Sequence, residues 1–199
     1  MNGMAWKKAA AYFQSKKSKE TSRRILAAVY DWTEAAVFSL VCVVLIFTFL
    51  IRIVGVDGTS MESTLMHQDR LLLYSWGYEP QRGDIVVINR FAEEPLIKRV
   101  IAIPGDTIDI DEEGTVWLNG AVLEEPYLDP DNLRNGTGTP RNQFSGPRDV
   151  PDGYLFVMGD NRLDSKDSRS TEVDLVRIGD VVGKAVFRVW PLSRFGSIY

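Results

Sequence analysis

Two residues, Ser60 and Lys98, lie in segments that would suit a nucleophile and its base. Ser60 follows Gly58 closely, and a serine on a tight turn that contains glycine can expose its hydroxyl. Lys98 lies within the apolar run 96–103, which has the length of a β-strand. Strand alternation puts Lys98 on the same face as three apolar residues, Leu96, Val100 and Ala102. Apolar surroundings disfavour an ammonium ion and lower the pKa of the amine, which could then take the proton of a serine hydroxyl.

Each segment also has an ordinary interpretation. Taken alone, Ser60 would be a surface serine. For Lys98 the segment alone favours neither a buried base nor an edge-strand lysine that keeps its charge in water. The single histidine, His67, follows Ser60 by seven residues and is the alternative base. We prefer Lys98 because its setting is the more apolar of the two. With one histidine and one cysteine, Cys42, the chain has little to offer a metal site and cannot form an internal disulfide.

Two further segments are dense in charged and polar side chains. Residues 159–169 read GDNRLDSKDSR and follow an apolar run at 154–158. In isolation this stretch would be interpreted as a solvated loop. The tripeptide Arg82-Gly83-Asp84 has the letters of an adhesion motif, but so short a tripeptide recurs by chance, and a turn that enters a strand is enough to explain it.

Taken together and in order, the four segments resemble the signature boxes of bacterial type I signal peptidases (leader peptidases). The boxes read SMxxTL, RGD, KRVIAIPGD and GDNRxxSxDSR, and the resemblance covers about residues 35–190. It implies a Ser/Lys serine endopeptidase that cleaves N-terminal signal peptides from exported preproteins and needs no cofactor or metal. Ser60 would be the nucleophile and Lys98 the general base, a variant of the serine-triad logic.

The resemblance also implies supporting roles for several other residues. Ser165 would position the lysine amine by hydrogen bonding. Met61 and Leu65 would flank the substrate cleft. Four charged residues would brace the site through ion pairs: Asp160, Asp167, Arg169 and Arg99.

Two positions depart from the family pattern. Ser63 stands where the first box usually has proline, which loosens the expected turn after the nucleophile. Gly58 stands where some relatives have a serine hydroxyl that helps to form the oxyanion hole. In this chain the hole would depend more on backbone N–H groups, including that of Ser60.

A membrane anchor is predicted just before the first box. Residues 35–51 carry no charge, and residues 53–54 extend the apolar run beyond Arg52, which can reach the interface. The run approaches the roughly 20 residues that a transmembrane helix needs. A cleavable signal peptide would have a shorter apolar core after a shorter basic region, and a buried core helix would have more polar positions.

Charge is distributed unevenly along the chain. Residues 1–34 contain seven Lys or Arg and three acids, whereas the remainder contains 16 basic and 24 acidic residues. The positive-inside rule therefore places the N-terminus in the bacterial cytoplasm and the rest outside it, on a single-pass anchor in the cytoplasmic membrane. An acidic body argues against a nucleic-acid partner, so the expected partners are preproteins and the lipid bilayer.

Short apolar runs separated by turn residues predict a mostly β fold, a compact barrel or sandwich, after one transmembrane helix. Expected strands lie at 70–76, 85–88, 96–103, 107–110, 115–118, 121–123, 154–158 and 181–190. Asn119-Gly120 predicts a two-residue hairpin turn. The long stretch 128–149 is rich in Pro, Gly, Asn and Asp and is predicted to be a loop.

The predicted organisation has three parts. Residues 1–34 form a basic cytoplasmic segment with partial helix, residues 35–54 the transmembrane helix, and residues 55–199 an extracytoplasmic β-rich catalytic domain. A smaller β-subdomain is inserted at about 107–153. Two rival classes are a self-cleaving Ser/Lys protease of the SOS-repressor type and a non-enzymatic anchored β-domain. The first should have a DNA-binding helix pair and no anchor, and this chain shows the opposite.

Overall fold

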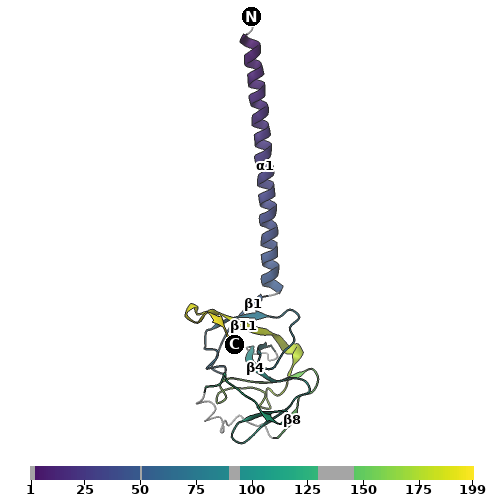
Figure 1. The fold of residues 1–199 in the computed structure, drawn as a ribbon, viewed down its shortest axis with the longest axis vertical. Coiled ribbons are helices and arrows are strands. Elements are labelled where there is room, and N and C mark those ends of the chain that lie inside the picture. The colour runs from purple at the N-terminus through teal and green to yellow at the C-terminus, as the bar shows by residue number, and fades with distance from the viewer. Residues whose placement is uncertain (1–2, 50, 90–94, 130–145) are drawn as a thin grey trace. The chain divides into compact units, whose positions relative to one another are not determined.

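The computed structural model of the 199-residue chain describes residues 3–49, 51–89, 95–129 and 146–199 (Figure 1). The chain divides into two compact units, Met1–Thr48 and Phe49–Tyr199. The first contains one helix and the second contains the strands, so the predicted mostly β fold class with an N-terminal apolar helix is confirmed. Two 3₁₀ turns, η2 at Ile178–Asp180 and η3 at Leu192–Arg194, complete the described elements of the second unit.

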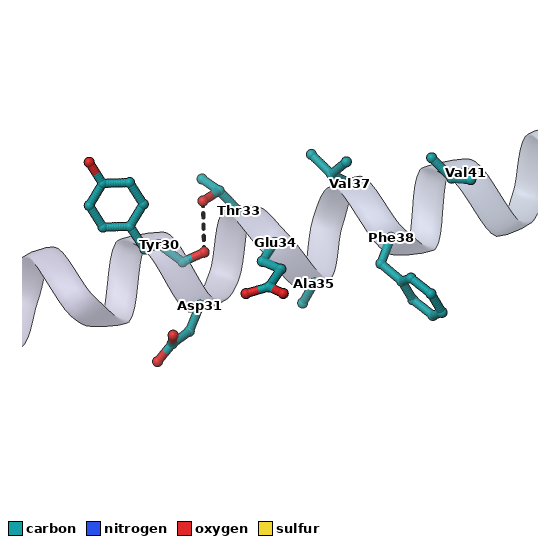
Figure 2. A pocket seen from close by; sticks show the side chains of 8 residues that line it. All are labelled: Tyr30, Asp31, Thr33, Glu34, Ala35, Val37, Phe38 and Val41. Atoms are coloured by element: carbon teal, nitrogen blue, oxygen red, sulfur yellow. Dashed lines mark hydrogen bonds between the residues drawn. The ribbon is translucent and has the colours of Figure 1, made fainter.

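Helix α1 runs from Gly3 to Phe49 and therefore includes the basic segment as well as the apolar one. Among the described residues, one stretch, Arg23–Ile46, is long and apolar enough to cross a membrane, with a mean hydropathy of 1.7. Figure 2 shows part of this helix, where the Thr33 hydroxyl donates to the Tyr30 carbonyl at 2.8 Å. A threonine bonded in this way has its polar group satisfied within its own helix. The eight residues labelled in Figure 2 line a pocket formed by α1 alone, and neither Ser60 nor Lys98 is among them.

The predicted end of the helix at residue 54 is wrong. Ile51–Gly55 forms strand β1, which pairs in antiparallel register with β2, from Ile51 opposite Tyr74 to Gly55 opposite Arg70. The run Ile-Arg-Ile-Val is rich in β-branched residues, which suit a pleated strand as well as a membrane helix. The pairing partner lies some 20 residues away in the sequence, so local hydropathy cannot distinguish the two.

The larger sheet of the described residues has eight antiparallel strands in the order β1-β2-β11-β3-β4-β9-β10, with β12 paired to β11. Several of the expected strands agree closely with the observed ones. The bounds beyond β1 are β2 Arg70–Tyr74, β3 Ile85–Ile88, β4 Leu96–Ala102, β9 Tyr154–Met158, β10 Val176–Arg177, β11 Val181–Trp190 and β12 Gly196–Ser197.

A smaller antiparallel sheet has the order β7-β6-β5-β8. Its strands are β5 Thr107–Ile110, β6 Val116–Leu118, β7 Ala121–Val122 and β8 Arg148–Asp149. Asn119 and Gly120 join β6 to β7 with φ values of 53° and 81°, the left-handed pair that the Asn-Gly signal predicts. The predicted loop 128–149 is wrong at its end, where β8 pairs with β5, and its residues 130–145 lie outside the described part of the chain. The separate subdomain at 107–153 stays a prediction.

Strands β3 and β4 occupy the interior of the larger sheet. All four residues of β3 and all but the first of β4 are buried, because apolar clusters pack on both of their faces. One cluster includes Met61 and Leu65 from the first signature box. The other includes Val86 and Val100. Lys98, opposite Val86 in the register, is thereby held within the best-buried part of the molecule.

Candidate active site

The segment Gly58–Leu65, called the nucleophile turn below after the role predicted for Ser60, presents Ser60 on consecutive turns. Gly58 has a φ of +89°, which glycine adopts without strain. The Leu65 amide donates to the Met61 carbonyl at 2.8 Å, and both side chains are buried in the core at 0% and 2% exposure. These two anchors fix the turn against the sheet. The contact of Met61 and Leu65 with substrate stays a prediction.

Ser60 and Lys98, 38 residues apart in the sequence, meet at this point. Lys98 Nζ lies 2.6 Å from Ser60 Oγ, a hydrogen-bond distance. The lysine side chain is only 2% exposed, as the apolar strand pattern predicts. Burial lowers the pKa of Lys98 to about 8, with the nearby carboxylate of Asp167 opposing the shift. A large part of the lysine is therefore uncharged at mildly alkaline pH, and its lone pair is available to Ser60.

Arg99, which follows the lysine, is buried in a bidentate pair with Asp160. Its Nε and Nη2 atoms donate to the two Asp160 oxygens at 2.8 and 2.6 Å. Burial opposes the charge of Arg99, but the bond to Asp160 prevails and raises its pKa. Thr64 Oγ1 donates to the same carboxylate at 2.5 Å, and Arg99 Nη1 donates to the Gly83 carbonyl at 2.8 Å. The pair thus joins the nucleophile turn to strand β4.

A second buried pair lies within the 159–169 segment. Arg169 donates to the two oxygens of Asp167 at 2.8 and 2.9 Å, and the Gly159 amide donates to Asp167 at 3.0 Å. Burial favours the neutral acid, but the hydrogen bonds and charge of Arg169 outweigh it and lower the pKa of Asp167. The segment expected in isolation to be a solvated loop is therefore largely buried, because each charge has a partner.

Ser165 lies beside this pair but does not make the hydrogen bond to Lys98 that the family resemblance implies. Its hydroxyl is buried and has no partner at normal hydrogen-bond geometry among the described residues. It is close enough to Asp167 to contribute to lowering the pKa of that carboxyl. An ideal Cβ placed on Gly159 would lie 2.2 Å from Ser165 Oγ, so glycine is needed for this close approach.

Two residues of the 159–169 segment that the sequence argument did not single out, Asn161 and Asp164, hold the nucleophile turn. The Asn161 amide donates to the Ser60 carbonyl at 3.0 Å, and Asn161 Nδ2 donates to the Thr59 carbonyl at 3.2 Å. Thr59 Oγ1 donates to Asp164 at 2.9 Å. Asn161 and Asp164 belong to a box that was recognised, but only the fold shows what they contact.

The C-terminal part of the chain braces the same turn, and no local signal indicated it. Arg188 on β11 donates to the Thr64 carbonyl at 2.5 Å and pairs with the buried Asp69 at 2.9 Å. Arg194 in η3 pairs with the other Asp69 oxygen at 2.6 Å. More than 100 residues separate the partners, so their pairing depends on the position of β11 beside β2.

His67 occupies an exposed position beside the turn. Its Nδ1 lies 3.1 Å from Asp57 and accepts from the Gly58 amide at 3.4 Å. The Ser60 hydroxyl is bonded to Lys98 and not to His67, and this geometry favours the lysine over the histidine as the base.

The backbone amide of Ser60 donates to no acceptor among the described residues, which leaves it available for an oxyanion.

The Arg82-Gly83-Asp84 tripeptide belongs to the scaffold. Arg82 forms a two-pronged ion pair with Asp106 of the Pro-Gly-Asp turn. Asp84 is 6% exposed, accepts from Tyr78 at 2.7 Å and pairs with Lys184 at 2.6 Å. A buried and paired Asp84 agrees with the turn interpretation, in which the tripeptide is part of the scaffold.

The departure from proline at position 63 has a structural counterpart. Ser63 has a φ of +76°, whereas proline is confined to about −65°. Ser63→Pro should therefore lower the melting temperature of the full chain in detergent by several °C, at a cost of about 1–3 kcal/mol. Ser63→Gly, which adopts the same φ freely and also lacks the serine hydroxyl, is the matched control and should melt at a higher temperature than Ser63→Pro. Equal melting of the proline variant would contradict the left-handed conformation.

Known proteins similar to this chain identify its family. A family model described as "Signal peptidase, peptidase S26" matches residues 29–190. Proteins named "Signal peptidase I" from Bacillus licheniformis and Bacillus amyloliquefaciens are 34% and 36% identical over 181 and 184 residues, covering 88% and 90% of this chain and 96% of each relative. A crystal structure of a signal peptidase I from Enterococcus faecalis aligns at 30% identity with a TM-score of 0.43, over 55% of this chain and 98% of that one. The chain belongs to the signal peptidase family, peptidase S26.

Proposed function

We propose that this protein is a membrane-anchored serine endopeptidase that removes N-terminal signal peptides from exported preproteins, with Ser60 as nucleophile and Lys98 as general base. The observation that carries the proposal is the 2.6 Å contact between the Ser60 hydroxyl and a lysine amine that is 2% exposed. A nucleophile in hydrogen-bond reach of a base with a suitable pKa is the arrangement that acyl transfer requires.

In the first half of the reaction, Ser60 Oγ attacks the scissile carbonyl carbon while its proton passes to Lys98 Nζ. The resulting oxyanion accepts a hydrogen bond from the Ser60 amide, which has no other acceptor among the described residues. As the intermediate collapses, the carbon–nitrogen bond breaks, and the protonated Lys98 gives its proton to the departing amine. An ester between Ser60 and the signal peptide remains.

In the second half, Lys98 is again neutral and accepts a proton from water. The hydroxide formed attacks the ester carbonyl, and the collapse of the second intermediate returns the proton to Ser60 Oγ. Lys98 thus acts in turn as base and acid in both halves. The ion pairs of Arg99 with Asp160 and of Arg169 with Asp167 hold their charges in fixed places, so that the lysine is kept from forming a direct ion pair with either carboxylate.

The substrate is expected to be an extended peptide with small residues before the cut. An extended chain can be bound by adding a strand to a sheet edge, which satisfies its backbone groups without selecting large side chains. This mode would let one enzyme accept many preproteins. Such broad acceptance agrees with the family description, which names signal peptides in general and no particular preprotein.

Anchoring would restrict the enzyme to the place where signal peptides emerge. Helix α1 holds the stretch Arg23–Ile46 that could cross the bilayer, and Ser60 follows the last residue of α1, Phe49, by 11 positions. That connection spans at most about 40 Å when fully extended. The excess of Lys and Arg before residue 35 orients the N-terminus toward the cytoplasm and the β unit toward the outside.

The test is cleavage of a purified preprotein by the full chain in detergent micelles or lipid vesicles. Ser60→Ala should show no cleavage above the background of the empty vesicles, because no hydroxyl is left to attack the carbonyl. Ser193→Ala, which changes an exposed serine in η3, is the matched control and should cleave normally. Retention of wild-type activity by folded Ser60→Ala would rule out the assigned nucleophile.

A further inference from the structure

The segment 123–129, called the strap below, follows the β6–β7 hairpin and carries a buried ion pair. Glu125 forms a two-pronged pair with Arg162 of the 159–169 segment, with one contact at 2.8 Å between Nη1 and Oε2. The two side chains are 6% and 5% exposed. Buried charges are costly unless paired, so this contact holds the strap in one place.

Tyr127, also in the strap, connects Glu125 to the residues around Ser60 and Lys98. Its hydroxyl donates to Glu125 Oε1 at 2.6 Å, and the Arg99 guanidinium lies 3.8 Å from its ring centroid. Its backbone carbonyl accepts from the Ser63 hydroxyl at 3.2 Å. One residue therefore contacts both the arginine next to Lys98 and the turn that carries Ser60.

Arg162, the other partner of Glu125, contacts further residues of the 159–169 segment. Its Nε donates to the Gly159 carbonyl at 3.2 Å, and its own carbonyl accepts from Arg169 at 3.0 Å. Glu125 thus lies between two groups of residues: Tyr127 with Arg99 and Ser63, and Arg162 with Gly159 and Arg169. Both groups border the Ser60–Lys98 pair, and neither Glu125 nor Tyr127 belongs to a signature box.

We infer that Glu125 and Tyr127 are positioning residues, which hold the nucleophile turn and strand β4 at the separation that lets Ser60 contact Lys98. The inference rests on the proposed function. In this chain the Tyr127 carbonyl of the strap accepts a hydrogen bond from the Ser63 hydroxyl. Ser63 has a left-handed backbone that proline could not adopt. The Ser63–Tyr127 bond then restrains a turn that lacks the rigidity of proline.

A positioning role and a merely stabilising role predict different kinetics. Loss of position acts on the attack of Ser60 and lowers kcat, since a displacement of about 1 Å can cost on the order of a hundredfold in rate. Loss of stability alone lowers the amount of folded enzyme and is corrected by assaying well below the melting temperature. Substrate binding is expected to change little, because the strap contacts the turn and Arg99 from within the protein.

The experiment measures kcat, KM and melting temperature for the full chain in detergent with a fluorogenic signal-peptide substrate. Glu125→Gln should lower kcat by about tenfold or more with KM within about twofold of the wild type. Glu124→Gln removes the neighbouring exposed carboxylate and should leave all three quantities unchanged. Val116→Ala opens a cavity in the apolar cluster that includes Ile108 and Phe156, and it should lower the melting temperature while preserving kcat.

Wild-type kcat in Glu125→Gln, with or without a lower melting temperature, would overturn the inference. If that variant does not fold, Tyr127→Phe decides, because it removes only the hydroxyl bonded to Glu125 and keeps the ring over Arg99. Its kcat should fall several-fold with a nearly unchanged melting temperature, and a wild-type kcat would again overturn the inference. The proposed function fails separately, through activity in Ser60→Ala.

Discussion

Replacing Lys98 with methionine should lower kcat for preprotein cleavage by about four orders of magnitude and should leave the protein folded. Methionine fills a similar volume in the apolar site but cannot accept a proton from Ser60. Lys166→Met is the matched control, because Lys166 lies in the 159–169 segment but is half-exposed and pairs at the surface with Glu172. A surface pair of this kind contributes little to stability, and the control should retain full activity.

The pH dependence of the wild-type enzyme tests the same lysine. Burial lowers the pKa of Lys98 to about 8, and only the neutral amine can act as the base. The value of kcat/KM should therefore rise about tenfold per pH unit below pH 8 and level off above it. A limb near the ordinary pKa of lysine, about 10.5, would contradict the buried-base assignment. The assignment would also be contradicted if the residual kcat/KM of Lys98→Met showed the same pH profile as that of the wild type.

Stability should respond to this substitution in the opposite direction to activity. At pH 7 the lysine is mostly charged in both states, and the folded state carries the cost of burying that charge. With a pKa lowered from 10.5 to about 8, the cost is on the order of 3 kcal/mol. It declines as pH rises from 8 toward 10.5, because there the folded state releases its proton first. Urea unfolding at pH 7 should therefore find Lys98→Met more stable than the wild type, and a less stable variant would mean that the ammonium is well solvated or well paired.

The strands that could be predicted are short apolar runs that follow a recognisable turn sequence. The run 85–88 follows a Gly-Asp turn and the run 107–110 follows a Pro-Gly-Asp turn, and both are observed strands with the predicted bounds. Strand β1 could not be predicted, because its apolar residues continue a membrane-like run and its partner β2 lies beyond the nucleophile turn. The two-residue strands β8, β10 and β12 are too short for any periodicity to indicate them.

In the candidate site, too, the residues within recognisable sequence motifs could be predicted, whereas residues whose contacts depend on distant segments could not. Strand alternation alone placed Lys98 among apolar residues, and the meeting with Ser60 was expected from family resemblance and is present at 2.6 Å. The hydrogen bond from Ser165 to Lys98 was expected on the same basis, and the described structure does not contain it. Glu125 and Tyr127 carry no recognisable pattern, because their partners Arg162 and Arg99 lie 37 and 28 positions away in the chain. Residues of this kind are found only once the fold has brought the segments together.

Gly159→Ala should strongly damage the β unit, because among the described glycines with a measured space for a Cβ, Gly159 has the closest neighbour. An added Cβ would lie 2.2 Å from Ser165 Oγ, 2.4 Å from the Ser60 carbonyl oxygen and 2.6 Å from Ser165 Cβ. The serine side chain could rotate away, but the carbonyl belongs to the nucleophile's own backbone and accepts from the Asn161 amide at 3.0 Å. Relieving the clash must therefore move Ser60 itself. We expect a loss of about 1–3 kcal/mol in the free energy of unfolding and of about a hundredfold in kcat.

Gly179→Ala is the matched control, because a Cβ at Gly179 has no atom within 4 Å and the residue does not require a left-handed backbone. That variant should keep wild-type kcat and match or slightly exceed the wild-type melting temperature, since alanine restricts the unfolded chain. The comparison separates the loss of glycine as such from the loss of space beside Ser60. If folded Gly159→Ala retained wild-type kcat, the Ser60 carbonyl could shift without moving its hydroxyl away from Lys98. The close packing of the 159–169 segment against the nucleophile turn would then not be what sets the distance between the two side chains.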